Sequence, residues 1–508
     1  MRETNNVMRG ISKNRRPMGR RAFFSVFLLG IFGVCGFAPV GAQQNGPSQE
    51  SPMTLEGDWS GLLRVGATSL RIVFHVTADG TQYSATMDSP DQGARGIPVS
   101  AVRIDGRNVA FEVAAIGGKY SGTLNETGAL EGTWKQSGQS LPLNLERQSA
   151  QTPQKPAAAS GEPSPPFPYI VKNVEFSDEK AGIQLAGTLT YPKGKGPFPG
   201  VVLVSGSGLQ NRDEEILGHK PFLVLADYLT RRGIAVLRYD DRGAGGSKGS
   251  FQSATTFDFA DDAQAAVDFL ARQTGIDAHH IGVIGHSEGA IVASILAARG
   301  AEDTQDAKVA FIVLLGGPGV RGDELLLMQN AALGRASGLS ESQIAQANKI
   351  NRELYSIAMS EGDVSTLRKK IVDTMNGVIE STPSLTAQQK EAQKAQVEAQ
   401  ADQLLSPWIR TFLSLDPSEY LRRVQVPVLA LDGSKDLQVP AKENLAAISA
   451  ALNAAGNHSA TMTELEGLNH LFQHANSGLP SEYGEIEETF APEALKQIGD
   501  WILSVGAR

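Results

Sequence analysis

Cysteine is nearly absent from this chain, whose 508 residues contain only Cys35. Because Cys35 lies in an apolar N-terminal stretch, the rest of the chain has no disulfide, no thiol nucleophile and no cysteine that could bind a metal. The fold must therefore rest on burial. The glycine-rich turn at residues 205–209 also lacks a following Gly-Lys-Ser/Thr and the glycine spacing of a dinucleotide site, which argues against a phosphate-binding loop.

Excess positive charge is also lacking. The formal net charge is -9, and residues 1–42 contribute seven Lys or Arg and one Glu, so the rest of the chain is near -15. Such an acidic surface repels phosphates, and we therefore expect no nucleic-acid partner. At 41% hydrophobic and 20% charged, the composition is that of a globular protein with length for about three domains.

Long apolar runs occur in one place only, at residues 22–40. A basic region ending in Arg20 and Arg21 precedes this run, and small residues that end at Ala42 follow it. The pattern predicts a signal peptide over residues 1–42, cleaved near Ala42, and a protein that is periplasmic or secreted. The paired arginines fit twin-arginine export, although general secretion stays open, and an uncleaved membrane anchor is the structural alternative.

Residues 53–147 show short alternating apolar runs separated by Asp-Gly and Gly-Gly turns. This predicts a small antiparallel β domain, either a sandwich or a barrel. Its larger aromatic residues could form a face that contacts envelope glycan or lipid, but in so small a domain they more often form the core. The aromatics concerned are Trp59, Tyr83, Tyr120 and Trp134. A linker rich in Pro, Ala, Gln and Ser follows at residues 148–168.

Residues 169–508 have a different sequence pattern, in which fully apolar runs alternate with helical patterns. The runs lie at 201–204, 234–239, 281–284, 310–315 and 427–431, with helical patterns at 221–232 and 257–273. Such strands indicate a parallel sheet covered on both faces, which is an α/β fold.

The alternation of strand and helix patterns is interrupted at residues 320–424, a segment rich in Ala, Gln, Glu and Lys with helical periodicity. We interpret this segment as an inserted helical cap that walls the pocket at the carboxyl edge of the sheet. Trp408, Phe412 and Leu413 either face a bound acyl group or, more commonly for such residues, pack inside the cap.

A serine on a tight strand-to-helix turn is the most specific catalytic signal. Gly-His-Ser-Glu-Gly at residues 285–289 follows an apolar run directly and precedes an apolar helical run. This context is typical of a nucleophile elbow, and it makes Ser287 the candidate nucleophile. Ser247 has the same glycine spacing, but it lies in a glycine-rich loop that no apolar helix follows at once.

A serine nucleophile needs a histidine to take its proton and an acid to orient that histidine. Asp436 follows a late strand and His470 follows the last strand-like run, which gives the chain order Ser, Asp, His. The competing acid is Asp432, and the other late histidines are His458 and His474. We interpret His286, inside the elbow, as a packing residue.

The developing oxyanion needs two hydrogen-bond donors. The backbone N–H of Glu288, directly after the nucleophile, is one candidate, and Ser207 in the glycine-rich turn is the other. Asp240, Asp241 and Arg242 are expected to brace neighbouring loops rather than bind metal, because no suitably spaced ligand lies nearby in the sequence.

These motifs together resemble a bacterial α/β-hydrolase of the esterase and serine aminopeptidase-like branch, which includes dienelactone hydrolase relatives. The resemblance covers residues 176–508, although Ser205 and Gly206 stand where many relatives have His-Gly. It implies hydrolysis of small-molecule acyl esters through an acyl-enzyme, without metal or organic cofactor. It says nothing about the β domain, and the sequence does not indicate an oligomeric state.

The sequence thus predicts an exported serine carboxylesterase. The same residues would also suit a peptidase or amidase. A third hypothesis is a cell-envelope binding protein whose hydrolase domain is not catalytic.

Overall fold

The computed structural model describes residues 55–147, with gaps at 66–67, 80–81, 90–93, 114–116, 126 and 137–138, and residues 161–505, with gaps at 301–307 and 384. The predicted signal peptide and most of the predicted linker lie outside these residues. None of the helices described combines the length and hydropathy needed to cross a bilayer.

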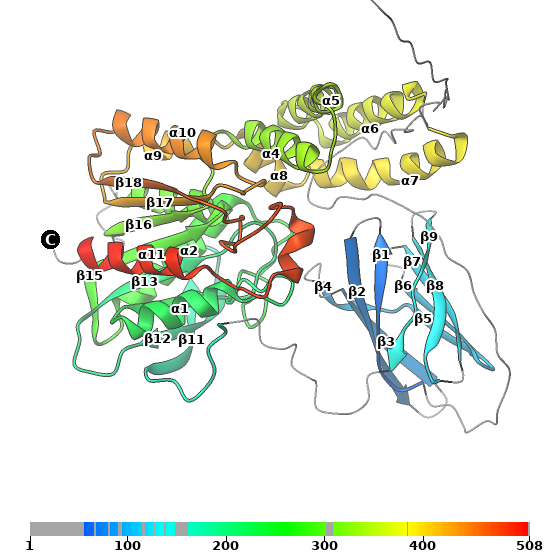
Figure 1. The fold of residues 1–508 in the computed structure, drawn as a ribbon, viewed down its shortest axis with the longest axis horizontal. Helices are drawn as coiled ribbons and strands as arrows, with labels where there is room; N and C mark the ends of the chain where they lie inside the picture. Colours follow the sequence, from blue (N-terminus) through cyan, green and yellow to red (C-terminus); the bar gives the residue numbers. More distant parts are fainter. Residues whose placement is uncertain are drawn as a thin grey trace, which may run out of the picture.

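The N-terminal unit is built from two five-stranded antiparallel sheets, with strand orders β10-β1-β2-β3-β4 and β5-β6-β7-β8-β9. Figure 1 shows these sheets in blue and cyan. The strands are β1 (Gly57–Val65), β2 (Thr68–Asp79), β3 (Gln82–Ser89), β4 (Ala94–Pro98), β5 (Ala101–Asp105), β6 (Asn108–Val113), β7 (Gly118–Leu124), β8 (Leu130–Gln136), β9 (Gln139–Pro142) and β10 (Glu146–Arg147). The predicted small all-β unit is therefore present.

Aromatic side chains fill the core of this unit. Phe74 stacks on Phe111 with ring centroids 4.4 Å apart. Trp59, Tyr120 and Trp134 are at most 2% exposed, and all three belong to the same core cluster. Because these three rings are buried, they cannot form the exposed glycan- or lipid-binding face that was one interpretation of them.

The C-terminal unit contains an eight-stranded sheet in the order β11-β12-β14-β13-β15-β16-β17-β18. From β14 to β18 all neighbouring strands are parallel, whereas β11 and β12 form an antiparallel edge. The strands are β11 (Ile170–Asp178), β12 (Ile183–Tyr191), β13 (Phe198–Val204), β14 (Ala235–Tyr239), β15 (Ile276–His286), β16 (Phe311–Leu315), β17 (Val428–Gly433) and β18 (Ala460–Leu465). This confirms the predicted α/β class with a mostly parallel sheet.

Helices cover both faces of this sheet, as Figure 1 shows. Side chains alternate along the strands, so Val201 and Leu203 pack toward α1 and α11 while Val202 and Val204 pack toward α2 and α3. The covering helices are α1 (Pro221–Arg231), α2 (Thr256–Ala271), α3 (Glu288–Arg299), α10 (Ala441–Ala454) and α11 (Pro492–Val505), and a 3-10 helix, η3, spans Pro480–Glu485.

The segment predicted to be a helical cap is helical. Its helices are α4 (Gly322–Ala336), α5 (Glu341–Met359), α6 (Val364–Ser381), α7 (Ala387–Leu404), α8 (Pro407–Ser414) and α9 (Pro417–Leu421). The cap has a hydrophobic cluster of its own, which includes Leu354, Ile371 and Leu413. Phe412 instead joins the main core, so α8 ties the cap to the sheet.

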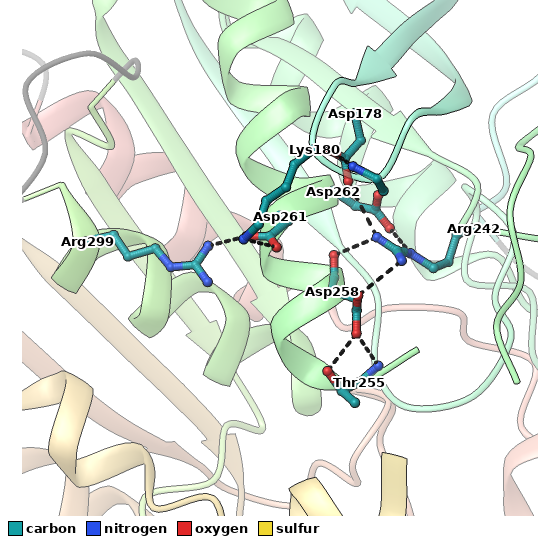
Figure 2. A network of polar contacts seen from close by, with 9 residues as sticks. Asp178, Lys180, Arg242, Thr255, Asp258, Asp261, Asp262 and Arg299 are labelled. Atoms are coloured by element: carbon teal, nitrogen blue, oxygen red, sulfur yellow. Dashed lines mark hydrogen bonds and ion pairs between the residues drawn. The ribbon is translucent and has the colours of Figure 1, made fainter. Parts of the chain in front are cut away.

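A buried ion network fixes α2 against the loop after β14. Figure 2 shows Asp178, Asp258 and Asp262 around the guanidinium of Arg242. Arg242 Nε donates to Asp262 Oδ2 at 2.7 Å, and Asp258 also caps α2 by accepting from the Thr255 backbone and hydroxyl. Burial raises the pKa of Asp262 to about 7 despite this partner. The network holds the loop that flanks the candidate site.

Candidate active site

Ser287 lies at the strained turn between β15 and α3, with a φ of 53° and a ψ of -118°. A side chain at Gly285 would collide with the backbone of Gly289, and one at Gly289 would collide with the carbonyl of Val204. Both glycines are therefore needed for the turn to fit between the strands. The Ser287 backbone N–H donates to the Leu315 carbonyl at 2.8 Å, which fixes the turn against β16.

His470 and Asp436 form a buried pair in the loops after β18 and β17. His470 Nδ1 lies 2.5 Å from Asp436 Oδ2, and both residues are 4% exposed. The other carboxylate oxygen of Asp436 accepts the backbone N–H groups of Gln438 and Val439 at 2.7 and 2.8 Å. These bonds fix the orientation of the carboxylate and, through it, of the imidazole.

The end of β16 passes close to this pair. A Cβ at Gly316 would lie 3.1 Å from His470 Nδ1 and 3.4 Å from Asp436 Oδ2, and Gly316 has a positive φ of 54°. The Ser287 turn is held to the same end of β16, because the Ser287 N–H donates to the carbonyl of Leu315. Among the described residues, no hydrogen bond joins Ser287 to His470. Such bonds are often long in unliganded enzymes and shorten when substrate binds.

The competing residues have other environments. Asp432 is 1% exposed, its Oδ1 accepts the Gly433 N–H at 2.8 Å, and burial beside Asp436 raises its pKa well above the usual value. His474 is exposed and pairs with Glu488 and Glu493. His458 is exposed in the irregular segment before β18. None of the three contacts the His470 imidazole through a hydrogen bond between described residues.

The glycine-rich turn supplies the possible oxyanion donors. The Gly206 N–H already donates to Glu214 Oε1 at 2.7 Å, and the Ser205 hydroxyl donates to Asp241 Oδ1 at 2.8 Å. Among the described residues, no hydrogen bond uses the backbone N–H of Ser207 or Glu288. The two donors predicted from the sequence therefore have no hydrogen-bond acceptor within the described residues.

Glu214 is a site residue that the sequence did not indicate. It is 1% exposed, has a positive φ of 50°, and accepts from both Gly206 and His286. His286 Nδ1 lies 2.8 Å from Glu214 Oε1, and its Nε2 lies 2.9 Å from the His470 carbonyl oxygen. His286 therefore links polar groups rather than merely packing. No motif in the sequence marks Glu214, because its partners lie far away along the chain.

The side chain of Glu288 connects the elbow to the cap. Its carboxyl accepts the Thr256 hydroxyl at 2.6 Å and the Trp408 indole N–H at 2.8 Å. Burial raises the pKa of Glu288 to about 7. Trp408 also stacks on Phe412 with ring centroids 5.4 Å apart, and Leu413 lies in the cap core. All three residues therefore make packing contacts within the protein, which was one of the two interpretations of them.

Ser247, which shares the glycine spacing of the elbow, has a structural role. It is buried, its hydroxyl donates to the Asp240 carbonyl at 2.6 Å, and it accepts the Ala186 N–H at 2.9 Å. Asp240 in turn binds the guanidinium of Arg212, and Asp241 binds the glycine-rich turn. These acidic residues brace loops, as expected. Within the described ranges, no group of three or more His, Cys, Asp or Glu residues is arranged to hold a metal.

Comparison with protein families gives one match that spans more than half of the chain. Residues 181–475 match the model of the family described as X-Pro dipeptidyl-peptidase (S15 family). The matched range contains Ser287, Asp436 and His470. The predicted resemblance to α/β-hydrolases and the predicted hydrolase class are thereby confirmed.

Individual relatives are more distant. The chain is 25% identical over 347 residues to esterase EstD of Thermotoga maritima, covering 66% of this chain and 70% of EstD. Est1E of Butyrivibrio proteoclasticus, solved with ferulic acid, is 17% identical with a TM-score of 0.38, and the match covers 66% of this chain and 100% of the Est1E chain. The Pyrococcus furiosus esterase Pf2001 is 17% identical with a TM-score of 0.39, and the match covers 66% of this chain and 91% of the Pf2001 chain. The fold assignment rests on the strand order and the family match, not on these structures.

Proposed function

The chain belongs to the X-Pro dipeptidyl-peptidase (S15) family, and we propose that it is a serine hydrolase that cleaves acyl esters with Ser287, His470 and Asp436. The observation that carries this proposal is the buried His470–Asp436 pair, 2.5 Å apart, at the sheet edge where the strained Ser287 turn lies. An imidazole held by a carboxylate near a strained serine is the arrangement that activates a hydroxyl.

The proposed reaction has two halves. His470 takes the proton of Ser287 as the serine oxygen attacks the ester carbonyl, while Asp436 stabilises the imidazolium. The backbone N–H groups of Glu288 and Ser207 hold the developing oxyanion. His470 then gives its proton to the leaving alcohol, and water, activated by the same histidine, releases the acid from Ser287.

A direct test compares the native protein with Ser287→Ala on p-nitrophenyl esters of two-carbon to ten-carbon acids. We expect the variant to lose turnover by several orders of magnitude while its thermal unfolding stays within a few degrees of native. The chain-length profile of the native protein would then give the size of the acyl pocket. Retained turnover in Ser287→Ala would reject the proposal.

A peptidase is the second candidate, and the description of the matched family favours it. The same nucleophile could attack an Xaa-Pro amide if a neighbouring group protonated the leaving amine. Parallel assays with an Xaa-Pro p-nitroanilide and the matching p-nitrophenyl ester separate the two activities. We expect the higher kcat/KM on the ester, because the relative EstD is an esterase.

Export is part of the proposal and rests on the N-terminal sequence alone. The basic region, apolar run and small residues up to Ala42 support removal of residues 1–42 during transport. N-terminal sequencing of protein from the periplasmic fraction should begin near Gln43. A protein that keeps residues 1–42 and stays with the membrane would instead be anchored by the apolar run.

A further inference from the structure

Two acid–imidazole pairs lie side by side in this site, and the proposed chemistry uses only one of them. The rings of His286 and His470 are 4.7 Å apart. Asp436 serves His470, and Glu214 serves His286. Glu214 and His286 are 1% and 6% exposed, so their pair is shielded from bulk solvent.

Both ring nitrogens of His286 have a partner. Nδ1 faces the Glu214 carboxylate and Nε2 faces the His470 carbonyl, and both partners are acceptors. A neutral imidazole has one N–H and can satisfy only one of them. With Glu214 as a carboxylate, only an imidazolium donates to both partners at once.

Glu214 connects this imidazolium to the oxyanion loop. Its Oε1 accepts the Gly206 N–H at 2.7 Å as well as the His286 Nδ1–H at 2.8 Å. The backbone of Glu214 has a φ of 50°, an unfavourable conformation for a residue with a side chain. Such strain persists where the surrounding contacts require it.

We propose that Glu214 and His286 are positioning residues: their ion pair sets the oxyanion loop at Gly206 and the backbone of His470 in one geometry relative to Ser287. This inference rests on the proposed serine hydrolase function. The Gly206 bond leaves the next N–H, that of Ser207, free to face the reacting oxygen. The bond to the His470 carbonyl holds the loop from which the catalytic imidazole projects.

The pair also predicts a pH dependence. Burial is the largest single effect and lowers the pKa of His286, but Glu214, the His470 carbonyl and Asp436 together outweigh it, and the net pKa lies above the usual value. The titratable groups that act on or pack against His286 are Glu214, the His470 imidazole with its ring centroid 4.7 Å away, and Asp436. As pH rises through the raised pKa, His286 loses one N–H and one of its two bonds. Activity should therefore fall at alkaline pH as this geometry is lost.

The test uses Glu214→Gln, with Glu215→Gln as the matched control one residue away. Glu215 is the neighbouring carboxylate, and its Oε2 accepts from the Asn211 side chain at 3.3 Å. We expect Glu214→Gln to lower kcat by about 10- to 100-fold with KM within about twofold, because misplacement of reacting groups affects the chemical step. The pH at which kcat falls on the alkaline side should be lower in this variant by about 1 pH unit or more, because the carboxylate that stabilises the imidazolium is gone. Glu215→Gln should match the native protein in both.

A second variant and a direct measurement guard against misfolding. His286→Gln should show a similar loss of kcat, and the double variant should lose no more than the worse single variant, since the two residues act as one unit. In the native protein labelled with 15N-histidine, NMR at pH 7 should show a buried histidine with protons on both ring nitrogens.

The outcomes are separable. If Ser287→Ala keeps its turnover, the proposed function fails. If Ser287 is required but Glu214→Gln keeps native kcat and pH profile, the positioning inference fails alone. A Glu214→Gln protein that is less stable but turns over normally when folded would make the pair a structural brace and would also overturn the inference, as would a neutral His286 in the NMR spectrum.

Discussion

Two acids near His470 have different environments, although only three residues separate them in the sequence. Asp436 contacts the imidazole directly, while burial beside Asp436 raises the pKa of Asp432 well above its usual value. Replacing Asp436 with Asn should lower kcat by about 10⁴-fold, because an amide favours the wrong histidine tautomer. Asp432→Asn resembles the uncharged acid, and it should keep kcat within about tenfold of native. A greater loss in Asp432→Asn than in Asp436→Asn would make Asp432 the triad acid.

Glu288 makes the link between elbow and cap sensitive to pH. Because its folded-state pKa is raised to about 7, its contribution to stability is fully present below the unfolded pKa near 4.5 and is lost as pH rises to about 7. Glu288→Gln removes this titration. Urea unfolding should therefore show the variant gaining stability relative to native between pH 4.5 and 8, by up to about 3 kcal/mol. A difference that does not change with pH would contradict this assignment.

At the scale of elements, Arg242 holds α2 against the β14 loop through buried carboxylates (Figure 2). Arg242→Gln leaves Asp178 and Asp262 without their cation, and it should lower the free energy of unfolding by about 3–5 kcal/mol. Lys180, which pairs with Asp261 in the same network but is exposed, provides the control. Lys180→Gln should cost less than about 1 kcal/mol in the same denaturant titration. Equal losses in the two variants would show that burial does not set the strength of these pairs.

The same scale shows what the sequence could and could not predict. Fully buried strands were found because they are apolar throughout, as at 201–204 and 281–284. The antiparallel strands β11 and β12 were missed. The edge strand β11 is mostly exposed, and β12 is mostly buried but contains Gly187, Thr188 and Thr190, so neither is a continuous apolar run. Ser287, Asp436 and His470 could be chosen because motif and chain order constrain them. Glu214 could not, because only folding brings it to His286, 72 residues away.

At the scale of the whole molecule, the described residues form separate cores. The aromatic cluster of the β unit and the clusters around the parallel sheet have no residue in common. Phe74→Ala should therefore lower the stability of the β unit by about 3–5 kcal/mol. Calorimetry should show the unfolding transition of the β unit at a lower temperature than in the native protein. Below that temperature, kcat on a p-nitrophenyl ester should equal that of the native protein. Loss of kcat in the folded variant would show that the β unit acts on the site.

The central claim is that His470 and Asp436 activate Ser287. The most direct measurement is covalent labelling of the native protein by a p-nitrophenyl phosphonate, with peptide mass spectrometry to locate the adduct. The account predicts one phosphonyl group per chain, on Ser287, with labelling slowed by orders of magnitude in His470→Gln. An adduct on another serine, such as Ser247, or labelling of Ser287 at an unchanged rate in His470→Gln, would contradict it.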